Sequence, residues 1–205
     1  MVNSSEASRL WRAAATLERV RRLGKGLPVV WFVTDPLRTP DPVSIAQGLP
    51  RGSGIIYRHF GRPDAEATAT KLAEIARARQ HTLLIGAGSL LASEVGAAGV
   101  HLPERMIGQV RQVGARYPGW IVTVAAHSPD AVWRAYAGGA DAVLLSTAFP
   151  SRSPSAGAPL GPVRLAAIAH AAPLPVFALG GVNSATAPRL LDTGVAGFAA
   201  VDVFR

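Results

Sequence analysis

His127 holds a position that suits acid–base chemistry. It follows an apolar, largely β-branched run, 121–124, and the residues after it, Ser128-Pro129-Asp130, are typical of a helix start. This order predicts an imidazole at the carboxyl end of a buried strand, where α/β proteins place their reactive groups. Because imidazole titrates near neutral pH, we predict that His127 transfers protons. The alternative is a histidine that only holds a neighbouring loop by a hydrogen bond.

Further polar side chains lie in or just after short apolar runs. Arg58 and Ser146 each follow such a run, and His101 lies within one. If the runs are strands that share one edge, an arginine and imidazoles meet there, which suits acid–base work on an anionic substrate. His101 has two open interpretations, catalysis and a structural hydrogen bond. His81 and His170 are expected at helix ends on the opposite side, exposed to water.

A pair of glycines, Gly180 and Gly181, follows another apolar run and precedes a helix start. Such a turn can present backbone N–H groups and a helix N-terminus to a phosphate, although paired glycines also simply turn the chain. Asp202, after the last apolar run, would repel a phosphate unless its carboxylate is turned away. Ser151, in a loop rich in Ser, Pro and Gly, either contacts an anion, belongs to a lid or is an ordinary exposed residue.

The order of the predicted elements indicates a (β/α)8 barrel. Short apolar runs alternate with helical patterns, as expected for parallel strands buried on both faces. An open doubly wound sheet is the alternative, but eight such units favour closure into a barrel. The predicted strands are 28–33, 54–57, 82–85, 99–102, 121–124, 142–145, 175–179 and 197–201.

We expect a single α/β domain over residues 1–205, with 1–26 as an N-terminal helical extension. A helical stripe of apolar residues predicts the first helix, from about Ser4 to Leu23. Two later helices are predicted over about 103–117 and from Asn183 or Ser184 onward. The sequence stops soon after the eighth strand, so the last outer helix of a barrel should be truncated, with the N-terminal helix covering part of that gap.

Composition narrows the classes of partner. The chain has 205 residues, a formal net charge of +8 and no cysteine, which excludes disulfides and thiolate metal sites. Its arginines are spread over many segments except for one cluster, Arg19, Arg21, Arg22 and Lys25, which suits a helix C-terminus. We therefore expect no nucleic-acid partner. We also expect no membrane span and no secretory signal, hence a cytoplasmic protein; a homo-oligomer stays open.

Several short motifs together resemble one known family. Their order and spacing over about residues 29–203 are similar to those of the thiamine phosphate synthase/TenI family, which implies a (β/α)8 barrel and a ligand from thiamine biosynthesis. The motifs are Gly99-Val100-His101-Leu102, Ala126-His127-Ser128, Gly139-Ala140-Asp141, Phe149-Pro150-Ser151 and Ala178-Leu179-Gly180-Gly181-Val182.

The family resemblance implies two chemistries. Synthases join a pyrimidine pyrophosphate to a thiazole phosphate with Mg²⁺, whereas TenI-like tautomerases shift a proton on a thiazole carboxylate phosphate without metal. This sequence differs from the synthase pattern at five places. Phe60 and Pro154 stand where the pattern has lysines, and Gly86-Ala87 stands where it has Asn-Asp. Met106 replaces a second acidic residue, and Asp202 replaces a serine. Too few oxygen ligands then remain for Mg²⁺ and too little positive charge for a pyrophosphate leaving group.

The resemblance is closer to the TenI-like branch, which Pro103 after the Gly-Val-His-Leu motif also fits. It implies a phosphorylated thiazole ligand, no metal and no cofactor. His127 would carry the proton shift and His101 would support or share it. Arg58 would hold a carboxylate or phosphate, and the Gly180-Gly181 turn would hold the phosphate. Two alternatives stay open: a thiamine phosphate synthase with an altered site, and a non-catalytic protein that binds the ligand.

Overall fold

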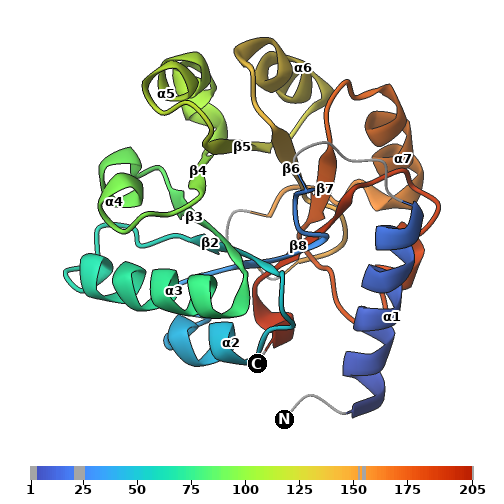
Figure 1. Cartoon of the computed structure of the whole chain (residues 1–205). Helices are drawn as coiled ribbons and strands as arrows, with labels where there is room; N and C mark the ends of the chain where they lie inside the picture. The colour runs from blue at the N-terminus through green and yellow to red at the C-terminus, as the bar shows by residue number, and fades with distance from the viewer. Residues whose placement is uncertain (1–3, 21–25, 152, 154–155, 205) are drawn as a thin grey trace.

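Eight parallel strands form a closed barrel in the computed structural model, which describes residues 4–20, 26–151, 153 and 156–204. Each strand pairs with the next along the chain, and β8 pairs with β1, which closes the ring (Figure 1). The predicted fold class is confirmed. The strands are β1 (Val30–Val33), β2 (Gly54–Tyr57), β3 (Thr82–Gly86), β4 (Gly99–Leu102), β5 (Ile121–Ala126), β6 (Ala142–Ser146), β7 (Val176–Leu179) and β8 (Gly197–Ala200).

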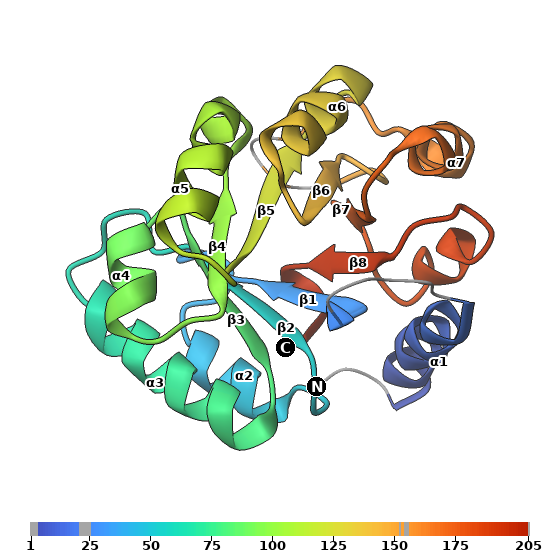
Figure 2. The same cartoon turned by 45° about the horizontal axis from the view of Figure 1, so that its top comes forward.

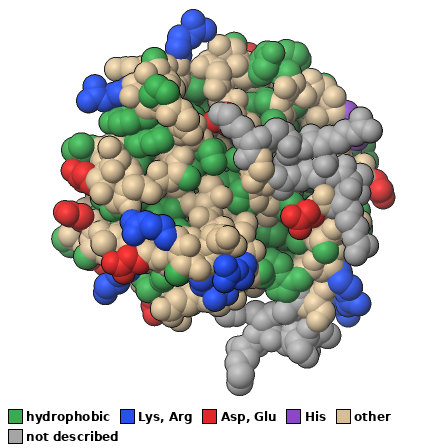
Figure 3. Space-filling view, in the orientation of Figure 1, with side chains coloured by type: hydrophobic (Ala, Val, Ile, Leu, Met, Phe, Trp, Pro, Cys, Tyr) green, Lys and Arg blue, Asp and Glu red, His purple; other side chains and the backbone are tan. Residues whose placement is uncertain are grey.

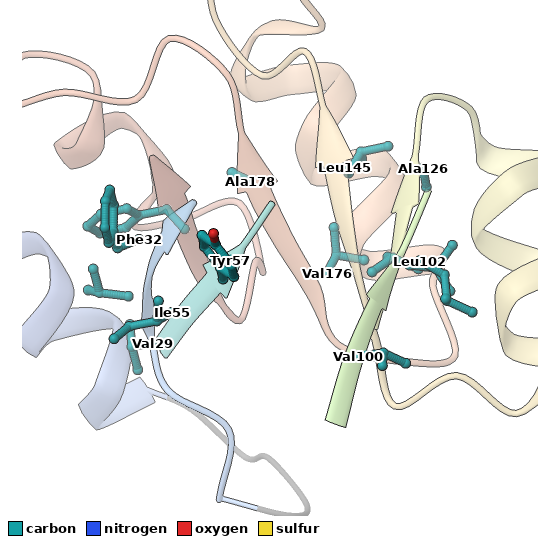
Figure 4. Close-up of a cluster of buried hydrophobic side chains, with 14 of the residues drawn as sticks. Val29, Phe32, Ile55, Tyr57, Val100, Leu102, Ala126, Leu145, Val176 and Ala178 are labelled. Carbon is teal, nitrogen blue, oxygen red and sulfur yellow. The ribbon is translucent and has the colours of Figure 1, made fainter. Parts of the chain in front are cut away.

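Both faces of the strands are buried, which explains why the strands are mostly apolar. Alternate residues such as Trp31, Ile56 and Phe177 form a cluster inside the barrel. The residues between them form a larger cluster against the helices, part of which is drawn in Figure 4, with Phe32 and Leu102 among its members. Burial on both faces replaces the alternation of polar and apolar residues that a half-exposed sheet would show.

The helices lie outside the ring of strands (Figure 2). Two of their starts are capped by side chains: the Ser128 hydroxyl accepts a hydrogen bond from the Ala131 N–H at 3.1 Å, and the Asp41 carboxylate accepts one from the Ser44 N–H at 3.0 Å. The helices after the first strand are α2 (Pro42–Gly48), α3 (Ala65–Arg79), α4 (Ser89–Glu94), α5 (Val110–Arg116), α6 (Pro129–Gly138) and α7 (Gly161–Ala171).

The N-terminal helix α1 (Ser4–Val20) packs against β8 and the 3₁₀ turn η3 (Ala187–Leu190), as the extension was predicted to do. Its apolar stripe, which includes Leu10 and Leu17, is buried. Trp11 contacts Phe204 of the 3₁₀ turn η4 (Asp202–Phe204), with ring centroids 6.0 Å apart. The barrel side next to β8 is therefore covered by the start of the chain. Residues 21–23, the expected end of this helix, lie outside the described residues.

Two predicted helices were wrong in form. The segment expected as one helix over 103–117 begins as a 3₁₀ helix, η2 (Glu104–Gln109), and becomes α5 only at Val110. Gly108, a poor helix former, lies within that first stretch. After β7 the expected helix is replaced by the short 3₁₀ helix η3, because a helix that begins at Ser184 would place Pro188, which has no N–H to donate, in its interior.

The two histidines expected to be exposed differ. His170 is exposed, with its Nδ1 2.8 Å from the Ala166 carbonyl oxygen, so that prediction is confirmed. His81 is buried, so its prediction was wrong. It directly precedes β3 and is enclosed near Ala46 and Ser53, and this burial lowers the pKa of its imidazole.

No helix among the described residues is long and apolar enough to cross a membrane. On the face drawn in Figure 3, the described arginine and lysine side chains lie singly among acidic and apolar ones. The side chains of the basic cluster predicted near residue 22 lie outside the described residues.

Candidate functional site

A cavity of about 320 Å³ opens at the carboxyl ends of β1, β2, β6, β7 and β8. The residues predicted to bind substrate all contribute to its wall, although they come from distant segments: Arg58, Ser146, Ser151, Gly180 and Gly181. The barrel brings them together because the ends of parallel strands share one rim. Its size is at the lower end of the range for small-molecule sites.

Arg58 is fixed by the loop after β1. Its Nε donates to the Thr34 carbonyl oxygen at 2.7 Å, and its backbone N–H donates to the Thr34 hydroxyl at 2.8 Å. Its Nη2 lies 3.4 Å from the Asp35 carboxylate. Burial lowers the pKa of the guanidinium, while the Asp35 charge acts in the opposite direction. Arginine nevertheless stays charged near neutral pH, so this side chain can attract an anion.

Arg38, which the sequence interpretation missed, supplies a second cation to the cavity. Its Nη1 lies 3.2 Å from Asp202 Oδ2, and its Nη2 lies 3.5 Å from Asp35 Oδ2. Burial alone would raise the pKa of Asp35, but hydrogen bonds from the Arg38 and Leu37 backbone N–H groups, with the two arginine charges, lower it. An arginine three residues after an aspartate that follows a strand is the signal that could have marked Arg38.

The paired-glycine turn is closely packed against the loop after β6. Gly180 and Gly181 have φ values of +96° and +65°, which side-chain-bearing residues rarely adopt. A Cβ on Gly180 would lie 2.9 Å from Thr147 Cγ2, and one on Gly181 would lie 2.7 Å from the Phe149 carbonyl oxygen. The turn is held from the other side by the Thr186 hydroxyl, which donates to the Gly181 carbonyl oxygen at 2.9 Å. The backbone of Gly180 and Gly181 is therefore exposed to the cavity and held in one conformation.

The two serines come from the sixth strand and its loop. Ser146 ends β6, and the Ser151 hydroxyl accepts a hydrogen bond from the Ser153 N–H at 3.2 Å. Both can offer hydroxyl groups to a ligand's oxygen atoms. Arg152 and Pro154 of the same loop lie outside the described residues.

His101 does not line the cavity; it is buried inside the barrel. Its Nδ1 lies 2.9 Å from the Thr123 hydroxyl on the neighbouring strand. Burial, with a smaller contribution from the positive charge of Arg58, lowers its pKa to about 3. The imidazole is therefore neutral near pH 7, and the geometry supports the structural interpretation of this residue over the catalytic one.

His127 lies on the rim and is about half exposed, but it does not line the cavity. Its Nδ1 lies 2.6 Å from Glu104 Oε2, and the same oxygen accepts the His127 backbone N–H at 2.9 Å. A carboxylate accepts hydrogen bonds, so this contact places the proton on Nδ1 and leaves Nε2 able to take another. The Arg134 Nη2 lies 3.4 Å from the other oxygen of Glu104.

Glu104 was also missed by the sequence interpretation. It comes two residues after β4, in the first turn of η2, and this turn carries its carboxylate to the end of β5. In a parallel barrel, a carboxylate two residues after one strand lies near a histidine directly after the next strand. That register was available from the sequence and could have identified the pair.

The described part of the site offers no suitable place for Mg²⁺. Among the described residues no group of three or more His, Cys, Asp or Glu could hold a metal ion. Gly86-Ala87 provides no side-chain oxygen, and Met106 packs against the outer apolar cluster. Asp202, which lines the cavity, and Asp35, which pairs with both Arg38 and Arg58, are engaged by arginines. Mg²⁺ needs several hard oxygen ligands, so the donors present do not fit it.

Comparison with known proteins decides the family. A family model described as thiamine monophosphate synthase (TMP-TENI) matches residues 32–204. The chain belongs to this family. A Geobacter sulfurreducens protein named "Putative thiamine-phosphate synthase" is 34% identical over 146 residues, 67% of this chain and 68% of that protein. A thiamine-phosphate synthase of Mycobacterium bovis is 36% identical over 108 residues, which is 51% of this chain and 48% of that protein.

A solved structure has a similar fold. The thiamine phosphate pyrophosphorylase of Pyrococcus furiosus aligns with a TM-score of 0.73 over 86% of both chains, at 24% identity. At that identity the likeness supports the fold. The chain is thus a thiamine-biosynthesis family barrel whose rim carries a two-arginine cavity and a separate glutamate–histidine pair.

Proposed function

We propose that this barrel binds a phosphorylated thiazole from thiamine synthesis, with the phosphate at the paired-glycine turn and Arg58. Support comes from the family, and from a cavity in which a fixed arginine, two serine hydroxyls and bare backbone surround one space. Family members named as synthases act in the same biosynthesis, so a phosphorylated heterocycle is the expected class of ligand.

For the reaction we propose a metal-independent proton shift on the bound heterocycle, carried by His127. The observation behind it is the 2.6 Å contact between His127 Nδ1 and Glu104, which orients the imidazole and leaves Nε2 to act as a base. Ala126 of β5 is paired with Leu145 of β6, so the next residues, His127 and Ser146, lie at the same height on the rim. Of these two, Ser146 lines the cavity. In the shift, Nε2 takes a proton as one bond to hydrogen breaks and returns it where the new bond forms.

The experiment is turnover of a thiazole carboxylate phosphate, followed by NMR in deuterated water without metal. We expect the wild-type protein to shift the proton, and His127→Ala to lose about 100-fold or more in kcat, the range for a general base. His170→Ala, which changes an exposed histidine at a helix end, is the matched control and should keep full activity. Full activity in His127→Ala would show that His127 is not the general base.

Thiamine phosphate synthesis is the second candidate, and the names of the relatives favour it over the proton shift. The residues at the rim argue against it, because Gly86-Ala87 and Met106 stand where the synthase pattern has the carboxylates that bind Mg²⁺. Incubation with a thiazole phosphate, a pyrimidine pyrophosphate and Mg²⁺ distinguishes the two. Release of pyrophosphate at a rate that follows the metal concentration would establish the synthase. Ligand binding without either product would indicate a non-catalytic member.

A further inference from the structure

Arg38 and Arg58, the arginines that line the cavity among the described residues, belong to one chain of ion pairs. Asp202 Oδ2 lies 3.2 Å from Arg38 Nη1, Arg38 Nη2 lies 3.5 Å from Asp35 Oδ2, and that oxygen lies 3.4 Å from Arg58 Nη2. Two positive charges are therefore matched by two negative ones inside the protein. A ligand anion that enters the cavity meets arginines that already have carboxylate partners.

The two carboxylates are held differently. The Asp35 side chain is 21% exposed and accepts hydrogen bonds from the backbone N–H groups of Leu37 and Arg38. The Asp202 side chain is 41% exposed and itself lines the cavity, as Arg38 does. Asp35 is thus a fixed part of the loop after β1, whereas Asp202 faces the same space as an incoming anion.

We infer that Asp202 is a specificity-determining residue, which competes with the ligand's phosphate for Arg38. A phosphate dianion in the cavity is repelled by the Asp202 carboxylate, and it gains Arg38 only as the pair with Asp202 weakens. The residue therefore sets how strongly the cavity holds a doubly charged group. This inference rests on the proposed function, because it needs a phosphate group in this cavity.

The test is calorimetric titration of the full chain with inorganic phosphate at low ionic strength. Asp202→Asn keeps the shape and an oxygen for Arg38 but removes the charge. We expect the variant to bind phosphate about fivefold more tightly, in line with a partly exposed charge pair. The gain should shrink as salt is added, because salt screens exposed charges.

Two further variants separate a local effect from general charge. Asp192→Asn changes the net charge equally at an exposed position outside the cavity, and it should leave phosphate affinity unchanged. In the Asp202→Asn background, Arg38→Gln should abolish the gain, because the two side chains act on the same ligand.

Each outcome decides between the two proposals. The inference is overturned if Asp202→Asn binds phosphate as tightly as the wild type or more weakly. Weaker binding would mean that the Asp202 carboxylate positions Arg38 for the ligand. Neither result affects the proposed function if the wild-type protein binds a thiazole phosphate in the same titration. If neither the wild-type protein nor Asp202→Asn binds phosphate or thiazole phosphate, both the inference and the proposed function are overturned. An equal gain in Asp192→Asn also overturns the inference, since the effect would then be one of net charge.

Discussion

One oxygen of Glu104 accepts both hydrogen bonds that fix His127, from the backbone N–H at 2.9 Å and from the ring Nδ1 at 2.6 Å. The two residues follow neighbouring strands, β4 and β5, and each is the first polar group that its loop presents near the rim. The shared oxygen sets the ring's orientation and its tautomer, the two properties that a general base needs. Glu104 therefore acts on the proposed reaction through His127.

Glu104→Gln should lower kcat for the proton shift by about tenfold with little change in KM, because the ring loses its charged partner while the binding cavity is untouched. Steady-state kinetics measures both constants, and ¹⁵N NMR of the imidazole reports which ring nitrogen carries the proton. The wild-type ring should show the proton on Nδ1, with a mixture in the variant. Glu94→Gln, at the exposed end of α4, is the control. An unchanged tautomer together with unchanged kcat would contradict the role of Glu104.

His101 should make the protein less stable in mild acid. Its pKa is about 3 in the fold against 6.5 for a free imidazole, so the unfolded chain binds more protons between these values. The contribution is fully present above pH 6.5 and is lost as pH falls toward 3, at roughly 1.4 kcal/mol per pH unit within that window. Urea unfolding at several pH values between 4 and 8 measures the slope.

The matched variants for this slope are His101→Gln and His170→Gln. The first should be less stable than the wild type at pH 7 but show a flatter dependence of unfolding free energy on pH, because the titrating group is gone. The second removes an exposed histidine and should keep the wild-type slope. Parallel curves for the wild type and His101→Gln would show that other groups cause the acid sensitivity.

The barrel was predictable from the sequence because its determinants are local. Each strand is a mostly apolar run buried on two faces, and the starts of α2 and α6 have side-chain caps, Asp41 and Ser128. The cavity wall followed from the rule that strand ends share a rim, which brought Arg58, Ser146 and Gly180 together. These inferences need only the order of the elements.

Other features depended on how individual loops bend, which the order of the elements does not determine. Arg38 reaches the cavity because the loop after β1 turns around the Asp35 side chain. Glu104 meets His127 because a 3₁₀ helix stands where a regular helix was expected. His81 is buried through packing beside Ala46 and Ser53, contacts that no local pattern announces.

Gly54→Ala should destabilise the protein by about 1–3 kcal/mol, the cost of overpacking a filled core. Gly54 begins β2 beside the Trp31 ring inside the barrel, and a Cβ there would overlap that ring. Gly114→Ala, at an exposed position in α5 where a Cβ would meet nothing within 4 Å, should instead stabilise by about 0.5–1 kcal/mol. Thermal and urea unfolding of both variants measure these opposite signs. Equal stabilities for Gly54→Ala and Gly114→Ala would mean that the Trp31 ring moves aside at little cost.

Arg58→Lys should weaken phosphate binding by about tenfold even though the charge is kept. The guanidinium donates from Nε to the Thr34 carbonyl oxygen and points Nη2 toward Asp35 at the same time, which the single ammonium of lysine cannot reproduce. The lysine should therefore lose its fixed position in the cavity. Titration with inorganic phosphate measures the effect, and Arg164→Lys on the exposed side of α7 is the control. Wild-type affinity in Arg58→Lys would show that charge alone, without the fixed geometry, holds the anion.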